Sequence, residues 1–246
     1  MLSVDLNCDM GEGSGNDHRI MPYISSANIA CGSHAGDENI MKQTVDLCIR
    51  HTVAIGAHPS FPDKENFGRI EMNLSSAEVY DTVFIQINKL SAIVKERGAT
   101  LHHVKPHGAL YNMAARDPSL AATIAKAVKD ADPALILYGL ANSYSIDEAK
   151  KAGLKTASEV FADRTYQDDG SLTSRKLSNA LITSVDESAA QVVQMIKNKT
   201  VRAVSGKTVL ILAETVCIHG DGAHAAEFAK TINERLKQED IDIKAI

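Results

Sequence analysis

Short β-rich segments alternate with longer amphipathic segments along almost the whole chain, and this alternation constrains the fold more than any other feature. The segments with strand character cover residues 3–8, 27–31, 53–57, 100–104, 135–139, 156–161 and 215–219, with a short eighth at 242–245. The segments with apolar residues at three- and four-residue spacing cover 38–50, 75–97, 118–129, 143–152, 186–197 and 223–238. This order predicts an α/β fold, a distorted (βα)7–8 TIM-like barrel of parallel strands ringed by helices.

The chain is expected to form one domain over residues 1–246, because 246 residues suit a single barrel and no repeat or proline-rich linker divides them. An apolar content of 44% provides enough material for a buried core. One interruption is predicted near 201–211, where two β-rich segments flank Ser205-Gly206-Lys207 and indicate a β-hairpin outside the barrel.

Charge and composition argue against several classes of partner. The net charge is −5, no stripe of Lys and Arg is interleaved with aromatic residues, and Trp is absent, so a nucleic-acid surface is not expected. The longest apolar stretch, 208–218, contains Glu214 and is too short to span a bilayer, and no signal peptide is visible. We therefore expect a cytoplasmic protein without a membrane partner, whose four scattered cysteines are reduced core residues.

Polar and titratable side chains follow six of the seven main predicted strands. Because the carboxyl ends of barrel strands open onto one mouth, these residues are expected to converge. In chain order they are Asn7, Asp9, Glu12, His34, Asp37, His58, Lys105, His107, Glu159, Asp163, Arg164 and His219. A single histidine or acid in such a list is more simply explained as structural, but the shared placement predicts a working site. The histidines without this placement, His18, His51, His102, His103 and His224, are interpreted as structural.

Two glycine-containing segments resemble phosphate-binding loops only superficially. Ser205-Gly206-Lys207-Thr208 has Val201 in place of the first glycine of a P-loop and lies in the predicted hairpin. The segment 11–15 carries a carboxylate, Glu12, that would repel phosphate. We therefore expect that this chain does not bind a nucleotide by itself.

Several motifs, in this order, resemble those of the LamB/YcsF family. They are Asp5-Leu6-Asn7-Cys8-Asp9-Met10-Gly11-Glu12, Asn28-Ile29-Ala30-Cys31-Gly32-Ser33-His34-Ala35-Gly36-Asp37, Gly56-Ala57-His58-Pro59, Lys105-Pro106-His107-Gly108-Ala109-Leu110-Tyr111-Asn112, Glu159-Val160-Phe161-Ala162-Asp163-Arg164 and His219-Gly220-Asp221. The resemblance runs from Val4 to about Leu236 and departs locally at Gly222-Ala223, where the cap of the last helix is expected.

The resemblance implies a barrel related to polysaccharide deacetylases and glycoside hydrolases, and a component of a bacterial ATP-dependent 5-oxoprolinase. Such a component works with the partner subunits B and C to open 5-oxoproline to L-glutamate. A five-membered lactam is a resonance-stabilised amide, so its opening requires activation, which ATP supplies. Because this chain lacks a credible nucleotide loop, ATP is expected to be bound by the partners.

The resemblance also suggests roles for the residues of the mouth. Asp9 or His58 would position and deprotonate a water molecule, while Lys105 and His107 would stabilise developing charge or protonate the leaving nitrogen. Arg164 would hold the substrate carboxylate. The further substrate contacts are predicted at Asn7, Glu12, His34, Asp37, Glu159, Asp163 and His219.

Two other functions compete with this one. A metal-dependent deacetylase or amidohydrolase acting on a small amide or amino sugar could use Asp9, His34 and His58 as ligands, although no His-x-x-x-His pair follows the second strand. A small-molecule-binding subunit without catalysis ranks third, because six titratable strand ends exceed what binding alone requires. The presence of a metal and self-association are left open.

Overall fold

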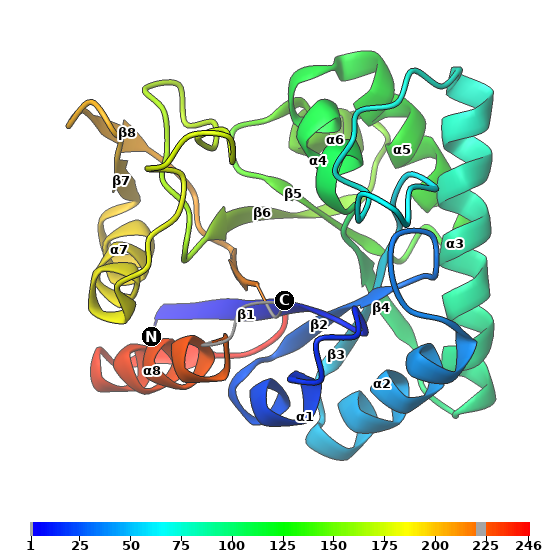
Figure 1. Ribbon diagram of the computed structural model, residues 1–246, viewed down its shortest axis with the longest axis horizontal. Helices are drawn as coiled ribbons and strands as arrows, with labels where there is room; N and C mark the ends of the chain where they lie inside the picture. The colour runs from blue at the N-terminus through cyan, green and yellow to red at the C-terminus, as the bar shows by residue number, and fades with distance from the viewer. Residues whose placement is uncertain (1, 220–224) are drawn as a thin grey trace.

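A computed structural model describes residues 2–219 and 225–246. Its centre is a closed barrel of seven parallel strands in the order β1-β2-β3-β4-β5-β6-β9, closed by pairing of β9 with β1 (Figure 1). These strands are β1 (Leu2–Met10), β2 (Ser26–Ala30), β3 (Ala54–His58), β4 (Leu101–Val104), β5 (Ile136–Leu140), β6 (Lys155–Phe161) and β9 (Thr215–Ile218). The predicted TIM-like barrel is therefore confirmed.

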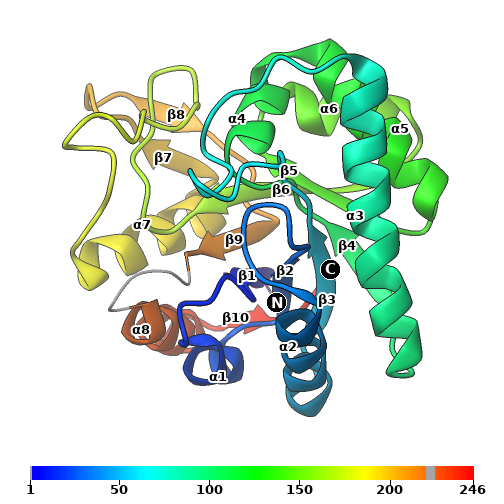
Figure 2. The same ribbon diagram turned by 45° about the vertical axis from the view of Figure 1, so that its right-hand side comes forward.

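Helices surround the barrel, as Figure 2 shows. They are α1 (Asp17–Ile20), α2 (Glu38–His51), α3 (Ser76–Glu96), α4 (Gly108–Arg116), α5 (Pro118–Ala131), α6 (Tyr144–Lys151), α7 (Val185–Asn198) and α8 (Ala225–Gln238), with a 3-10 turn at Met21–Tyr23. The sequence predicted six of them and missed α1 and α4. The predicted start of the last helix at Ala223, its cap at Gly222-Ala223 and the interpretation of His224 fall outside the described residues.

Two further elements lie outside the closed barrel. β10 (Ile241–Ile243), the predicted short eighth strand, pairs in parallel with the first residues of β1. β7 (Thr200–Arg202) and β8 (Thr208–Leu210) form the predicted antiparallel hairpin. The P-loop-like Ser205-Gly206-Lys207 connects these two strands, so it has no strand-to-helix context. No described helix is both long and apolar enough to cross a lipid bilayer.

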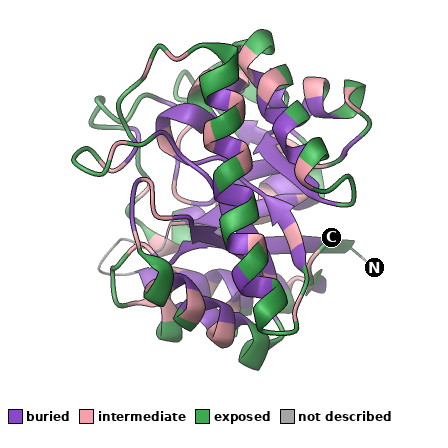
Figure 3. Cartoon of the chain, turned by 90° about the vertical axis from the view of Figure 1, so that its right-hand side faces the viewer, coloured by how far each residue is buried: buried purple, intermediate pink, exposed green. Residues whose placement is uncertain are grey.

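The apolar core lies between the strands and the helices, where Figure 3 shows the buried surfaces of both layers. On β1 the outward residues Leu6, Cys8 and Met10 are fully buried under the helices. The alternate residues point into the barrel, as the two-residue period of a strand requires. A capping box begins the longest helix, α3, where the Ser75 side chain accepts from the backbone of Glu78 and the Glu78 carboxylate accepts from the backbone of Ser75.

The interior of the barrel is polar, in contrast to the apolar core between the strands and the helices. The buried polar residues of the strands include Asp5, Asn7, Ser26, Asn28, His103, Glu159 and Thr215. His103 lies within β4, and its imidazole occupies the space beside Gly56. A Cβ at Gly56 would come within 2.0 Å of His103 Nε2, so glycine is required there.

Candidate active site

The strand ends open into a cavity of about 790 Å³. Its lining includes seven residues that the sequence predicted for the site: Asp9, Glu12, His58, Lys105, His107, Arg164 and His219. A cavity of this size accommodates a small organic ligand. The predicted convergence of several strand ends is thus observed in the fold.

Lys105 is the centre of the buried charge at the floor of this cavity. Its Nζ lies 2.9 Å from Asp9 Oδ1 and 3.0 Å from Glu159 Oε1, and the lysine side chain is 3% exposed. Nζ also donates to Cys217 Sγ at 3.0 Å and lies 5.4 Å from the centre of the Phe161 ring. Two carboxylates therefore hold one ammonium group in a site that solvent barely reaches.

The charges at this floor fix the protonation of both partners. Burial alone would lower the pKa of Lys105, but Asp9, and with it Glu159, raises the pKa well above its usual value. Burial alone would raise the pKa of Asp9, but His58 and Lys105 hold it well below its usual value. An ammonium group and a carboxylate face each other at neutral pH, so Lys105 is suited to stabilising negative charge and not to accepting a proton.

Asparagine side chains hold the floor in place from inside the barrel. Asn28 Nδ2 donates to Asp9 Oδ1 at 2.8 Å and to Asn7 Oδ1 at 2.7 Å. Asn7 Nδ2 in turn donates to Glu159 Oε1 at 2.9 Å. His103 Nε2 lies 2.8 Å from Asn28 Oδ1, which orients that amide. The residues predicted as substrate contacts at positions 7 and 159 lie beneath the lining and support it.

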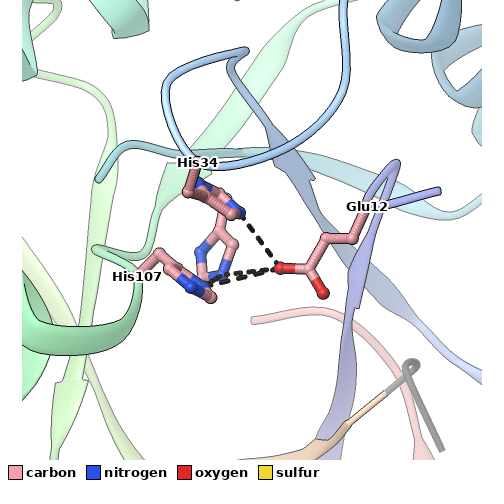
Figure 4. Close-up of side chains that lie close together, drawn as sticks. Glu12, His34 and His107 are labelled. Atoms are coloured by element: carbon pink, nitrogen blue, oxygen red, sulfur yellow. Dashed lines mark hydrogen bonds and ion pairs between the residues drawn. The ribbon is translucent and has the colours of Figure 1, made fainter. Parts of the chain in front are cut away.

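Three histidines and a glutamate cluster at one wall of the cavity, which Glu12, His58 and His107 line while His34 lies behind them. His34 Nε2 lies 3.1 Å from Glu12 Oε1, and His107 Nδ1 lies 3.5 Å from the same oxygen. Figure 4 shows the His34 and His107 rings facing the Glu12 carboxylate. The two rings are stacked, with centroids 3.8 Å apart and planes 4° apart. His58 meets His107 edge-on, with its Nε2 2.9 Å from His107 Nδ1.

Backbone carbonyls orient two of these imidazoles. His58 Nδ1 lies 2.7 Å from the carbonyl oxygen of Lys105, and His107 Nε2 lies 2.9 Å from that of Phe67. Burial, followed by the charge of His58, lowers the pKa of His34 to about 3, and the same two causes lower the pKa of His107 further. His107 is therefore neutral near pH 7, which disfavours its predicted role as a proton donor to a leaving nitrogen.

The opposite wall comes from the ends of β6 and β9. His219 Nδ1 lies 2.8 Å from Asp163 Oδ2, and Arg175 Nη2 lies 2.9 Å from His219 Nε2. Burial alone would raise the pKa of Asp163, but His219 lowers it. The His219 ring stacks on Phe161, with centroids 5.5 Å apart. This wall is a hydrogen-bonded chain of Asp163, His219 and Arg175 beside the Lys105 floor.

Two residues that were predicted to contact substrate instead form hydrogen bonds with backbone groups of the protein. Asp37 is exposed, and its carboxylate accepts from the backbone of Ile40 as the N-cap of α2. Asp37 thus serves as a helix cap, and the structure does not bring its side chain to the cavity. Arg164 lines the cavity, but its Nε and Nη2 donate to the carbonyls of Ala180 and Thr173, so this edge of the guanidinium is not available for a substrate carboxylate.

The sequence did not indicate four other side chains at this site: Phe67, Tyr111, Arg175 and Cys217. Cys217 could have been found from the two-residue alternation that places Thr215, Cys217 and His219 on one side of the same segment. Phe67 and Arg175 lie in irregular loops that carry no periodic signal. Tyr111 lies on α4, which was itself not predicted.

Two groups of potential metal ligands occur in the described part of the chain. One is Glu12, His34, His58 and His107, and the other is Asp9, Cys217 and His219, with candidate ligand atoms within 4.8 Å of one another. The set Asp9, His34 and His58 considered from sequence is not one of them. In the second group Lys105 Nζ already contacts Asp9 Oδ1 and Cys217 Sγ, so an ammonium group occupies the space.

Comparisons with known proteins extend over the full length of the chain. The model of the LamB/YcsF family matches residues 4–246. A protein of Shouchella clausii, named as the A subunit of 5-oxoprolinase, is 58% identical over 250 residues, covering 100% of this chain and 99% of that protein. A protein of Tolumonas auensis with the same name is 54% identical over 251 residues, with both chains fully covered.

Solved structures agree with the sequence comparisons. The crystal structure of a lactam utilization protein from Thermus thermophilus superimposes with a TM-score of 0.94 at 44% identity and covers all of both chains. A putative cellobiose-phosphate cleavage protein from Enterococcus faecalis shares the fold at a TM-score of 0.57 and 12% identity. The resemblance suggested by the sequence motifs is confirmed, and the chain belongs to the LamB/YcsF family.

Proposed function

We propose that this chain is the A subunit of an ATP-dependent 5-oxoprolinase, which opens 5-oxo-L-proline to L-glutamate after partner subunits B and C have activated the lactam. The observation that carries the proposal is full-length identity of 52–58% to proteins named as the A subunit of 5-oxoprolinase. The name of the Thermus relative, a lactam utilization protein, supports the same substrate class. The word "subunit" in the names of the other relatives supports a complex with further chains.

The floor of the cavity suits hydrolysis of an activated lactam. Attack of water on the ring carbon places negative charge on the former carbonyl oxygen, and a fixed buried cation lowers the energy of that charge. Lys105 is such a cation, since two carboxylates hold it in position. Asp9 Oδ2 lies 3.4 Å from His58 Nε2, so this pair stands beside the cation as the candidate base for the attacking water.

The loops of this chain support a division of labour in which ATP is bound by other subunits. Neither glycine-containing segment forms a nucleotide loop: Ser205-Gly206-Lys207 lies in a hairpin, and Glu12 faces the histidine wall. We propose that the partner subunits bind ATP as a co-substrate of the complex. The isolated chain is expected to have no ATPase activity.

The test is reconstitution of the three proteins with 5-oxoproline and ATP, following glutamate and ADP while each protein is omitted in turn. We expect glutamate only when all three are present. Glutamate formation that is independent of this chain contradicts the proposal.

A metal-dependent amidohydrolase remains the second candidate, because a glutamate and three histidines cluster beside the cavity. It is distinguished by hydrolysis of a small amide by the isolated chain without ATP or partners. The same purified chain serves for both assays, so one preparation separates the two functions.

A further inference from the structure

The atoms around His58 Nε2 are all hydrogen-bond acceptors when the ring is neutral. A carbonyl oxygen can only accept, so the 2.7 Å contact of His58 Nδ1 with the carbonyl of Lys105 places the ring proton on Nδ1. Nε2 then carries a lone pair. It faces Asp9 Oδ2 at 3.4 Å and Glu12 Oε1 at 3.9 Å, which are carboxylate oxygens.

His107 presents a second lone pair to the same point. Its Nε2 donates to the carbonyl of Phe67 at 2.9 Å, which leaves Nδ1 without a proton. His107 Nδ1 lies 2.9 Å from His58 Nε2. Two nitrogen lone pairs at that distance repel each other unless a positively charged species lies between them or beside them.

The spacing of three of these atoms fits a transition-metal ion. Ligands about 2.0–2.1 Å from a tetrahedral Zn²⁺ ion stand about 3.3 Å from one another. The distances among His58 Nε2, His107 Nδ1 and Glu12 Oε1 are 2.9, 3.5 and 3.9 Å. Backbone carbonyls that hold the second nitrogen of each histidine are the usual outer partners of metal-bound imidazole.

Buried carboxylates beside the histidines favour the binding of a cation. Three carboxylates have 7% or less of their side chains exposed: Asp9, Glu12 and Glu159. Lys105 is the ammonium group that contacts two of them.

His34 is suited to hold a metal ligand in place and not to bind the ion itself. It does not line the cavity, whereas Glu12, His58 and His107 do. Its ring lies parallel to that of His107 at 3.8 Å between centroids, an orientation in which both rings cannot aim a nitrogen at one ion. Its Nε2 contacts Glu12 Oε1 at 3.1 Å and can hold the carboxylate in place.

The geometry points to a binding site for one divalent first-row transition-metal ion, held by Glu12, His58 and His107 and oriented by His34. Three protein ligands leave coordination positions open toward the cavity, the arrangement of sites in which a metal binds water or substrate. The site goes beyond the proposed function and does not depend on it, since metal binding is measured without lactam, ATP or partner subunits.

The experiment uses tag-free, chelator-stripped chain and Zn²⁺ alone. Isothermal titration is expected to show one ion per chain, and histidine-detected NMR of the wild-type protein is expected to show shifts of His58 and His107 but not of exposed His51. Absence of stoichiometric Zn²⁺ binding overturns the proposal.

Variants locate the site. Glu12→Gln keeps the side-chain shape, and it and His107→Ala are each expected to weaken Zn²⁺ binding by at least about 100-fold, whereas His34→Ala, an outer partner, weakens it by about 10- to 100-fold. His51→Ala removes an exposed histidine of α2 and should leave binding unchanged. Circular dichroism checks the fold of each variant. Zn²⁺ binding that survives both Glu12→Gln and His107→Ala contradicts this site.

Discussion

The two ends of the barrel interior treat buried polar groups in opposite ways. At the amino-terminal end of β1, Asp5 accepts hydrogen bonds of 2.6 Å from the hydroxyls of Ser25, Ser26 and Thr215. Nearer the carboxyl-terminal end, where Glu159 pairs with Lys105, Glu159 Oε2 is a buried atom without a hydrogen-bond partner among the described residues. The same strands thus carry a satisfied network at one end and an unsatisfied one at the other.

This difference separates stability from function along a single set of strands. A fully bonded buried network fixes the structure, whereas unpaired polar atoms and facing lone pairs cost free energy in the absence of a ligand. Asn7 joins the two ends, since its Nδ2 donates both to Thr215 Oγ1 and to Glu159 Oε1. We infer that the network around Asp5, the lower network, is a rigid base. The groups around Lys105, the upper network, are held against this base for a ligand.

Removal of the Lys105 charge from the carboxyl-terminal end of the barrel should have the largest effect on activity. In Lys105→Met, the charge that would stabilise the reacting oxygen is lost, so kcat in the reconstituted complex should fall by about 100- to 1000-fold. The variant also leaves Asp9 and Glu159 unpaired, which should lower the free energy of unfolding by about 3–5 kcal/mol. Activity is therefore expressed per folded molecule after a urea titration.

The matched control for this variant is Lys155→Met. Lys155 is exposed at the first residue of β6, at the opposite end of the barrel. We expect wild-type kcat and stability within about 0.5 kcal/mol. Full activity of Lys105→Met would show that function at the carboxyl-terminal end of the barrel does not depend on this charge.

Weakening of the lower network should reduce stability and leave chemistry intact. Asp5→Asn exchanges a carboxylate that accepts three hydroxyl hydrogen bonds for an amide with a single acceptor oxygen. The free energy of unfolding should fall by about 2–4 kcal/mol, while kcat per folded molecule changes by less than about threefold. Denaturant unfolding and the glutamate assay measure the two quantities. A loss of kcat as large as that of Lys105→Met would show that the two ends are not separate.

Acid should reveal the stabilising charge of Asp9. Burial alone would raise its pKa, but His58 and Lys105 hold it well below 3.8. A carboxyl group with a depressed pKa in the folded state contributes stability that is fully present above its unfolded pKa and is lost as the pH falls toward the folded pKa. The stability difference between wild type and Asp9→Asn should therefore shrink below about pH 4.

Urea titrations at pH 6 and pH 3 measure this difference. Asp81→Asn, at an exposed position of α3, controls for the general effect of acid on surface carboxylates. A difference between wild type and Asp9→Asn that stays constant across this range would mean that Asp9 is not held ionised by its neighbours.

The fold could be predicted from sequence because its signals are periodic. Each barrel strand was placed to within about two residues, and the hairpin and capping box follow from local patterns. Helix α4 was missed because it begins directly after His107 at Gly108, whose φ of 57° is unusual for the start of a helix. Four-residue α1 is too short to show a helical period.

The site could be predicted only as a set of strand ends. Seven predicted residues line the cavity, because parallel strands bring their carboxyl ends together. What each residue contacts depends on side-chain direction after the strand, which periodicity does not encode. Asp37 thus turns to cap α2, and Arg164 binds the carbonyls of a loop. The sequence suggested Asp9 as the carboxylate beside the histidines, whereas the structure places Glu12 there. Side-chain direction is again the cause.

The smallest effect is expected at Cys217, although it touches the central lysine. Its Sγ accepts from Lys105 Nζ at 3.0 Å. Burial raises the pKa of the Cys217 thiol well above its usual value, despite the opposing effect of Lys105. The group is therefore a neutral thiol at neutral pH, and a neutral thiol is a poor nucleophile.

Cys217→Ser supplies a hydroxyl that can accept the same hydrogen bond, so kcat should change by less than about threefold. Iodoacetamide at pH 8 should leave the folded wild-type chain unmodified, because all four cysteines are buried thiols. Cys48→Ser, in the core beside Met21 and away from Lys105, is the matched control and should affect stability alone. A loss of kcat above about 100-fold in Cys217→Ser but not in Cys48→Ser would make the sulfur a participant in the chemistry, and the upper network would then be held for covalent attack and not for charge stabilisation.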